Sequence, residues 1–326
     1  MMRVFLLLLS LLPTLPVSNA TADIIDQANV RSFIDEMVEK HQFDRSWLEK
    51  LFRQASIQPR IIKTMNKPAE KMPWYKYRRI FIRDERINKG IEFYRKHKSV
   101  LERAETEFRI PAEILLAIVG VETLYGERTG GHQVIDALST LAFNYPKRAN
   151  FFRNELEQLL LLVREEDIDP FSVQGSYAGA IGQPQFMPSS YREYAIDYDG
   201  DGQRDLQNSV ADTIGSVANY LKRHGWQAGG DIVVNAKIHD EKSIDSFLDR
   251  GLKPSIPFRT LNQNGVQVKG KIAANELVSF IQLEASEDQF EYWIGEHNFY
   301  VITRYNHSPL YALAVVQLAR AIKQSI

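Results

Sequence analysis

The sequence contains no cysteine among its 326 residues. A chain without cysteine forms no disulfides, so its stability must come from a hydrophobic core, from bound ions, or from both. It also lacks the thiol that carries the acyl chains of a bacterial lipoprotein, so we expect no lipid anchor. Hydrophobic residues make up 44% and charged residues 25%, which is typical of a globular protein and allows two domains or one large one.

The sequence also lacks an excess of charge of one sign and an apolar run long enough to span a membrane. Its net charge is −1, so we expect no nucleic-acid partner. The apolar run 4–12 follows Arg3 and stops at Pro13, short of the roughly 20 residues that a bilayer requires. Small residues at Ser18 and Ala20 complete the pattern of a secretory signal and predict cleavage after Ala20. We expect a soluble exported protein, periplasmic or secreted, and disfavour the alternative of a membrane anchor.

The spacing of apolar residues divides the rest of the chain into helical and β-like parts. Spacings of three and four predict helices, and short apolar runs between Gly, Asn and Asp predict strands. The expected elements are helices over 24–41, 86–108 and from 110 onward, β-like runs over 229–239, 265–272 and 289–306, and a closing helix over 308–324. No internal repeat interrupts this order.

One carboxylate, Glu122, lies where an apolar helix would otherwise bury a methyl group. The helix is expected to start at Pro111 and to end at Gly126. On a 3.6-residue period Glu122 shares its face with Leu115, Ile118, Val119 and Tyr125. Burial of a carboxylate is costly unless it is paired or protonated, so Glu122 is either a core carboxylate paired with Arg or Lys, or a functional group. Its apolar surroundings predict a raised pKa, which a general acid near neutral pH requires.

A glycine-rich motif, "GSYAGAIGQPQFMPSSY", covers residues 175–191. Its glycines permit close backbone approach or positive φ, although tight helix packing explains them equally well. Ser176 and Gln185 can hydrogen-bond a polar ligand, and Phe186 offers a ring face. The motif lacks the Lys and the glycine order of a phosphate-binding loop.

An acidic loop, "DYDGDGQRDLQN", covers residues 197–208 and follows the EF-hand calcium pattern. The expected ligands are Asp197, Asp199, Asp201, the backbone carbonyl of Gln203, and Asp205. Position twelve is Asn208 where a bidentate Glu is usual, and Asp212 is the expected substitute. Carboxylates this close repel one another unless a cation neutralises them, so the alternative of a plain acidic turn is disfavoured. We predict a structural Ca²⁺ and no organic cofactor.

Four separated motifs together resemble the lytic murein transglycosylase B family: "VGVETLYG", the glycine-rich motif, the acidic loop running into "SVADTIGSVANYLKRHGW", and "RYNHSPLYALAV". The resemblance implies an α+β fold, mainly α, with a lysozyme-like core, an N-terminal α domain and a small inserted antiparallel β domain. The implied boundaries are a signal at 1–20, the α domain at 21–110, the core at 111–225, the β domain at 226–303, and the last core helix at 304–326.

The resemblance also implies a chemistry with one carboxyl. In the family an acid protonates the glycosidic oxygen between N-acetylmuramic acid and N-acetylglucosamine, and the same residue then takes a proton from the muramyl 6-hydroxyl, which closes a 1,6-anhydro ring. Glu122 would fill both roles. Glycosidases usually need two carboxylates, and the sequence offers no clear second one, because Asp136 is expected near a helix start and the acidic loop is expected to bind calcium.

Other site residues are implied by matching motifs, as contacts to the sugar or as walls of the cleft. They are Ser176, Gln185, Phe186, Tyr77, Tyr305, Asn306 and Tyr311. For the tyrosines the alternative is ordinary core packing, and for Ser176 and Gln185 it is a hydrogen bond within the loop.

We expect a monomer that binds peptidoglycan glycan strands, and the sequence leaves open partners among proteins of cell-wall synthesis or remodelling. Two other functions also stay open. A hydrolytic muramidase of the same fold would consume water and would need a second carboxylate or a polar group to hold that water. A catalytically silent, calcium-stabilised glycan-binding protein would keep the aromatic residues but would not need Glu122 on an apolar face.

Overall fold

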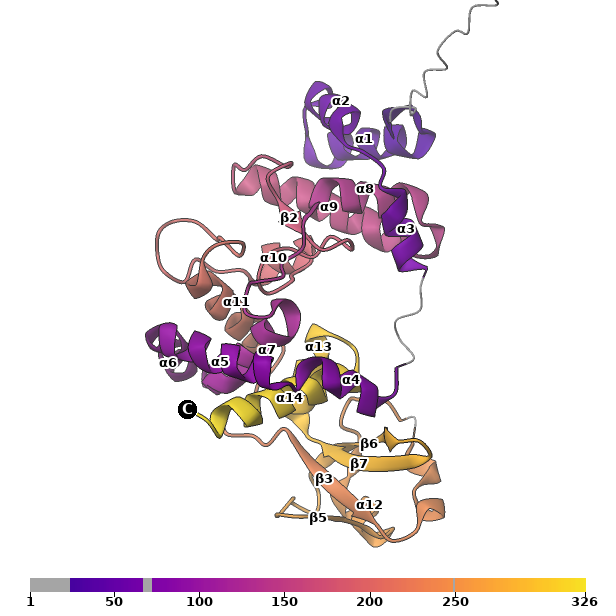
Figure 1. Cartoon of the computed structure of the whole chain (residues 1–326). Coiled ribbons are helices and arrows are strands. Elements are labelled where there is room, and N and C mark those ends of the chain that lie inside the picture. The colour runs from indigo at the N-terminus through magenta and orange to yellow at the C-terminus, as the bar shows by residue number, and fades with distance from the viewer. Residues whose placement is uncertain (1–23, 67–71, 249) are drawn as a thin grey trace, which may run out of the picture. The chain divides into compact units, whose positions relative to one another are not determined.

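The computed structural model describes residues 24–66, 72–248 and 250–326 (Figure 1). The signal segment predicted at residues 1–20 lies outside these ranges. Contacts divide the chain into two compact units, residues 1–56 and 57–326. The domain boundaries expected at residues 110, 225 and 303 follow the family resemblance and stay predictions.

The described part of the first unit is a short 3-10 helix, Ile24–Asp26, followed by α1 (Ala28–His41) and α2 (Arg45–Gln54). Its core includes an edge-to-face pair between Phe33 of α1 and Phe52 of α2, with ring centroids 5.9 Å apart. Asp44 caps α2 by accepting a hydrogen bond of 2.7 Å from the backbone N–H of Trp47. The predicted helix over 24–41 is therefore confirmed, with its first turn in 3-10 form.

The second unit is mainly helical and carries one larger sheet. Its helices are α3 (Pro59–Met65), α4 (Trp74–Phe81), α5 (Asp84–Lys96), α6 (Lys98–Phe108), α7 (Ala112–Thr123), α8 (Val134–Asn144), α9 (Ala149–Glu165), α10 (Pro188–Tyr194), α11 (Val210–Arg223), α12 (Phe258–Gln263), α13 (His297–Tyr305) and α14 (Pro309–Lys323). A two-residue pair, β1 (His132–Gln133) and β2 (Gln174–Gly175), joins the segment before α8 to the glycine-rich motif.

Helix α7 lies at the centre of this unit. Its side chains from 114 to 121 are all buried, and it packs against α14, α11, α6 and α5. A helix that is apolar on all sides is stable only when other helices surround it. The unit thus encloses the middle of α7, and the polar side chains that remain partly exposed lie at its two ends, Glu113 in the first turn and Glu122 in the last.

The structure corrects two predicted helix limits. The predicted helix over 86–108 is two helices, because α5 ends at Lys96 and α6 begins at Lys98. Helix α7 ends at Thr123 and not at Gly126, since Leu124 and Tyr125 already have left-handed backbones with φ of 53° and 61°. Such φ values are uncommon for residues with side chains, so tertiary contacts must hold this turn.

The larger sheet is antiparallel, with strand order β4-β6-β7-β3-β5. The strands are β3 (Val233–Ile238), β4 (Ile256–Pro257), β5 (Val266–Val268), β6 (Leu277–Ser286) and β7 (Gln289–Gly295). β6 and β7 form a hairpin whose register pairs Ser279 with Gly295 and Ser286 with Gln289. One face packs with α12 into a separate apolar core that includes Leu261, Val266 and Ile294. The small antiparallel β region is therefore confirmed.

The predicted β-like run over 289–306 is wrong beyond Gly295. Residues His297–Tyr305 form α13, which buries Phe299, Val301 and Ile302. The Asn298 side chain bonds the backbone of Gln227 and Gly230 and ties α13 to the chain before β3. The closing helix is confirmed as α14. Across the described ranges, none of the helices has the length and hydrophobicity that crossing a bilayer requires.

Candidate functional site

The carboxyl of Glu122 lies at the last turn of α7 and faces a group of tyrosines. Tyr311, in the first turn of α14, donates a hydrogen bond of 2.7 Å from its hydroxyl to Glu122 Oε1. Burial raises the pKa of Tyr77 of α4 and of Tyr305 of α13, and the nearby charge of Glu122 raises each of them further. The structure thus brings Glu122 together with Tyr77, Tyr305 and Tyr311. We call these three tyrosines the tyrosine cluster.

Burial sets the electrostatics of this group. It raises the pKa of Glu122 to about 7, and the hydrogen bond from Tyr311 acts in the opposite direction. Among the described residues, no second carboxylate contributes to that shift, and no Arg or Lys lowers the pKa by pairing with Glu122. The alternative of a core carboxylate paired with a cation therefore does not describe Glu122. Its carboxyl can hold a proton near neutral pH and release it there.

The end of α7 is held by a residue that sequence reasoning missed. Arg86 of α5 is 5% exposed, and its guanidinium donates to the carbonyls of Gly120 and Val121 in the last turn of α7. The hydroxyl of Tyr125 donates 2.9 Å back to the carbonyl of Arg86. Gly120 is required here, because a Cβ at this position would lie 2.6 Å from the ring of Tyr125. These contacts stabilise the left-handed turn that follows Glu122.

Arg86 is also linked to the tyrosine cluster through the ring of Phe81. Its guanidinium lies 5.1 Å from the centre of the Phe81 ring, and Phe81 packs against Tyr77 with ring centroids 5.0 Å apart. The sequence pattern does not distinguish Arg86 as a site residue, because it is one of many basic residues in α4 and α5.

The glycine-rich motif packs against the C-terminal end of α7 and against Tyr305 of the tyrosine cluster. The Thr123 hydroxyl donates 2.8 Å to the carbonyl of Gln183, and Tyr305 donates 2.6 Å to the carbonyl of Pro184. Phe186 is buried and packs on Tyr305 with ring centroids 5.7 Å apart. Phe186 therefore packs behind the tyrosine cluster, and its buried ring does not offer the exposed face that a sugar would stack on.

The two polar side chains expected to contact the sugar make hydrogen bonds within the loop. Gln185 donates from Nε2 to the carbonyls of Thr129, at 2.9 Å, and Gly182, at 2.8 Å. Ser176 accepts from the backbone N–H of Ala180 at 3.1 Å. Both remain partly exposed, so contacts to a ligand stay a prediction. Asn306 is exposed at the turn between α13 and α14, where its backbone carbonyl accepts a hydrogen bond of 2.7 Å from the N–H of Ser308, and its contact to a ligand stays a prediction.

The acidic loop brings three of its predicted ligands to one point. Oxygen atoms of Asp197, Asp199 and Asp212 lie within 4.8 Å of one another. Asp212 is fully buried, and its two oxygens accept backbone N–H groups of Tyr198 and Asp205 at 2.7 Å and 2.8 Å. Asp212 thus lies beside two carboxylates of the loop, and its role as the substitute for the missing Glu stays a prediction. Three carboxylates that converge on one point fit the oxygen ligands that Ca²⁺ prefers.

The other predicted ligands are not in that group. Asp201 accepts from the backbone of Gln203 at 2.8 Å, and Asp205 accepts from Gln207 and Asn208 at 2.9 Å each. Their oxygens shape the loop in this structure, as does the sharp turn at Gly202 with φ of 93°. A role for Asp201, Gln203 and Asp205 at the ion stays a prediction.

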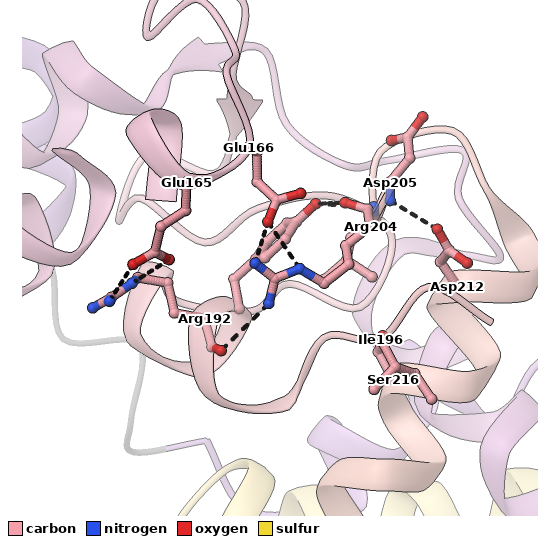
Figure 2. Close-up of polar contacts among 10 residues, drawn as sticks. Glu165, Glu166, Arg192, Ile196, Arg204, Asp205, Asp212 and Ser216 are labelled. Carbon is pink, nitrogen blue, oxygen red and sulfur yellow. Dashed lines mark hydrogen bonds and ion pairs between the residues drawn. The ribbon is translucent and has the colours of Figure 1, made fainter. Parts of the chain in front are cut away.

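Ion pairs anchor the acidic loop to the helical body (Figure 2). Arg204, inside the loop, donates from Nε to Glu166 at the end of α9 at 2.8 Å. Next to this pair, Arg192 of α10 binds Glu165, and the Tyr191 hydroxyl donates to the carbonyl of Arg204. Figure 2 also shows the backbone N–H of Asp205 directed at Asp212. The loop is therefore fastened on both flanks.

A buried second carboxylate, Glu155 of α9, has a structural explanation. It accepts hydrogen bonds from the backbone N–H of Ser189 at 3.0 Å and from its hydroxyl at 2.8 Å, at the start of α10. Asp136 lies in the first turn of α8, as predicted. Neither contributes to the raised pKa of Glu122.

A mainly helical core that holds a protonatable carboxyl at a helix end, beside three tyrosines, defines a candidate acid–base active site. Comparison with known proteins identifies the family. The family model described as "Transglycosylase SLT domain" matches residues 26–320, and the chain therefore belongs to the transglycosylase SLT domain family.

Three relatives illustrate the similarity. The chain is 40% identical over 310 residues to membrane-bound lytic murein transglycosylase B of Escherichia coli K12, covering 92% of this chain and 84% of that protein. The soluble lytic transglycosylase SltB1 of Pseudomonas aeruginosa matches with a TM-score of 0.86 and 46% identity, over 91% of this chain and 99% of that one. The E. coli lytic transglycosylase Slt35, solved in complex with calcium, matches with a TM-score of 0.85 and 39% identity, over 93% and 95%. These matches confirm the expected α+β fold with a lysozyme-like core.

Proposed function

We propose that this protein is a lytic transglycosylase that cleaves the β-1,4 bond between N-acetylmuramic acid and N-acetylglucosamine in peptidoglycan. The observation that carries the proposal is the setting of Glu122: a carboxyl with a pKa of about 7, a single hydrogen bond from Tyr311, and no second carboxylate acting on it among the described residues. Relatives of 39% to 46% identity are named lytic transglycosylases, which supports the same reaction here.

In the first half of the reaction Glu122 acts as an acid. Its protonated carboxyl gives a proton to the glycosidic oxygen, and the bond between that oxygen and the anomeric carbon of the muramyl sugar breaks. The acetamido oxygen of the same sugar bonds to the anomeric carbon, so the departing sugar leaves with the proton. Since Tyr311 already occupies Oε1, Oε2 is the oxygen available for proton transfer.

In the second half Glu122 acts as a base. Its carboxylate removes the proton of the muramyl 6-hydroxyl, whose oxygen bonds to the anomeric carbon and displaces the acetamido oxygen. The product ends in a 1,6-anhydro sugar, Glu122 regains its proton, and no water is consumed. A pKa near 7 suits both halves, because the group must give and retake one proton at similar pH.

A calcium ion held by Asp197, Asp199 and Asp212 completes the proposal. The ion would neutralise three carboxylates that converge within 4.8 Å. Its role would be structural, since a short path of bonds joins the loop to the catalytic helix: Gln183 donates to the carbonyl of Leu206 at 2.9 Å and accepts from Thr123 at 2.8 Å. The calcium complex of Slt35 supports the assignment.

The deciding experiment is digestion of purified peptidoglycan sacculi followed by mass spectrometry of the released fragments. We expect fragments lighter by one water than the reducing ends that a muramidase makes, and none with the Glu122→Gln variant. Reducing ends that carry oxygen from labelled water would establish the muramidase instead. Binding to sacculi without any release would establish the silent glycan-binding protein.

We also propose that the chain is exported and cleaved after Ala20, because residues 1–20 have the pattern of a secretory signal. Peptide sequencing of the protein purified from the periplasmic fraction should give Thr21 as its first residue. Retention of Met1 in that fraction would contradict the cleavage.

A further inference from the structure

A pocket of about 420 Å³ lies between α5 and the turn that follows Glu122. Its walls are one side of α5, the turn 125–127 after α7, Gln183 of the glycine-rich motif and Val210 at the start of α11. Helix α5 packs directly on α7 (Figure 1). Neither Glu122 nor a tyrosine of the cluster is among the described residues that line this pocket, so it is separate from the candidate active site.

The charged groups of this pocket have both signs. Lys89 of α5 donates a hydrogen bond to Glu127 of the turn, so these two charges neutralise each other. Within the described ranges, the side chains of Glu92, Lys96 and His97 form no hydrogen bond and no ion pair. The pocket therefore offers an ammonium group and an imidazole to the acceptors of a ligand, and a carboxylate to its donors.

A buried amide with one weak hydrogen bond adds to these groups. Gln183 is 6% exposed, and its Oε1 has no hydrogen-bond partner within the described chain. Its Nε2 donates only a long bond of 3.4 Å, to the carbonyl of Gln207. A Cβ on Gly126, which also lines the pocket, would lie 2.9 Å from this Oε1. A buried polar atom without a partner is costly, so a ligand that bonds the Gln183 amide would relieve that cost.

The apolar part of the pocket is aromatic and ordered. The ring of Phe93 packs on His97 and on Tyr125, with ring centroids 4.5 Å and 5.6 Å apart. A simple anion would meet the carboxylate of Glu92 next to Lys96, and a neutral sugar would leave both charges unmatched. A short peptide with free ends carries a carboxylate, an ammonium group, an amide between them and small apolar side chains. Its chemistry matches all the groups of the pocket.

We propose that this pocket is a second binding site, which takes a short peptide with free ends. Lys96 and His97 bind its carboxylate, Glu92 binds its ammonium group, and Gln183 bonds its amide. The volume is within the range of pockets that hold small molecules. The bound peptide would touch the turn next to Glu122, because the Thr123 hydroxyl donates 2.8 Å to the carbonyl of Gln183 and accepts 3.1 Å from the N–H of Gly126.

The test is calorimetric titration of the full-length protein with the dipeptide alanyl-alanine, in its L,L and its D,D form. This probe has no glycosidic bond, so the result does not depend on the proposed function. We expect binding, and a loss of about 3- to 10-fold in affinity when the carboxylate of the dipeptide is amidated or its amine is acetylated. Preference for the D,D form would assign the site to peptides of the cell wall, and preference for the L,L form to peptides cut from proteins.

Two variants assign the two ends of the peptide. Lys96→Met should weaken the free dipeptide about 3- to 10-fold but its amide less than twofold, since the two changes remove the same contact. Glu92→Gln should weaken the free dipeptide and spare the acetylated one in the same way. Lys98→Met is the matched control, because Lys98 is an exposed lysine at the start of α6 that does not line the pocket.

Three results would each overturn the proposal. The first is a Kd above about 10 mM for both forms of the dipeptide. The second is an equal effect of Lys96→Met and Lys98→Met. The third is an equal loss of the free and the amidated dipeptide in Lys96→Met, which would mean that Lys96 does not bind the carboxylate. All three substitutions are at exposed positions, so we expect each variant to fold.

Discussion

The carboxyl of Glu122 and the carboxylates of the acidic loop have opposite surroundings. Glu122 accepts one hydrogen bond, from Tyr311, and burial raises its pKa to about 7. Asp197 in the acidic loop accepts three backbone N–H groups, from Gly200, Asp201 and Gly202. The bond from Gly202 contributes most to holding the pKa of Asp197 below its ordinary value. One carboxyl is kept protonatable, and the other is kept charged.

The difference teaches how the same chemical group is directed to proton transfer or to cation binding. Hydrogen bonds to an oxygen stabilise its ionised form, and burial without them destabilises it. Asp212 combines both influences, because burial raises its pKa while the backbone N–H groups of Asp205 and Tyr198 lower it. A cation beside Asp212 would decide that balance in favour of the charged form.

The largest effect on activity is expected when the protonatable carboxyl of Glu122 is removed, because the contrast with the acidic loop then disappears. Glu122→Gln keeps the shape of the side chain and the acceptor for Tyr311 but cannot transfer a proton. We expect release of muropeptides from sacculi to fall by more than about 100-fold, given the typical ~10²–10⁴-fold contribution of one acid–base group. Circular dichroism should show an unchanged fold. A variant that retains more than about a hundredth of the activity would refute the role of Glu122.

The same variant should be more stable than the wild-type protein at alkaline pH. The pKa of Glu122 rises on folding from 4.5 to about 7, so between these values the folded state binds the proton more tightly than the unfolded state. Stability is therefore lost as pH rises through this window. Glu122→Gln removes that loss, which is up to about 3 kcal/mol at pH 8. Urea unfolding at pH 5 and pH 8 measures it, and an equal difference at both pH values would contradict the prediction.

Removal of calcium should affect the acidic loop and leave Glu122 unchanged. If the ion binds, free calcium at about 100 times Kd adds about 2.7 kcal/mol of stability, which a chelator removes. Asp199→Asn should abolish the response, and Asp201→Asn tests whether Asp201 joins the ion. Asp240→Asn, which removes a capping carboxylate of the β region, should retain it. A melting temperature that ignores both chelator and calcium would exclude the ion.

The smallest effect is expected at Gln185. Gln185→Ala removes donors from the carbonyls of Thr129 and Gly182, at a cost of about 0.5–1.5 kcal/mol per bond. We also expect muropeptide release to fall about 3- to 100-fold, because the loop that it shapes lies beside Glu122. Gln133→Ala removes one bond of an exposed Gln on β1 and serves as the control. Equal activity of the two variants would place Gln185 outside the site.

The sequence predicted the parts of the site that depend on local pattern. The apolar period around Glu122, the aspartate spacing of the acidic loop and the closing helix with Tyr311 all depend on residues a few positions apart. Helix α13 was mistaken for a strand because "NFYVIT" is rich in β-branched and aromatic residues. Burial of Phe299 and Ile302 on one face outweighed that propensity.

Long-range contacts could not be predicted in this way. Arg86 reaches the carbonyl of Gly120 across 34 residues, and nothing in its neighbourhood distinguishes it from the other basic residues of α5. Likewise, the β6–β7 hairpin reaches a cavity near Tyr77 only through the packing of α4 on the sheet. Contacts of this kind depend on how whole elements pack, which the apolar period of a single element does not determine.

The bond between Tyr311 and Glu122 joins residues 189 positions apart. Tyr311 belongs to α14, so the hydroxyl that binds Glu122 is synthesised long after Glu122 itself. A growing chain that already contains Glu122 lacks this hydrogen bond until α14 packs on α7. The order of translation therefore bears on the proposed function: a chain truncated before Pro309 would carry Glu122 without Tyr311, and we expect such a chain to cut no glycan.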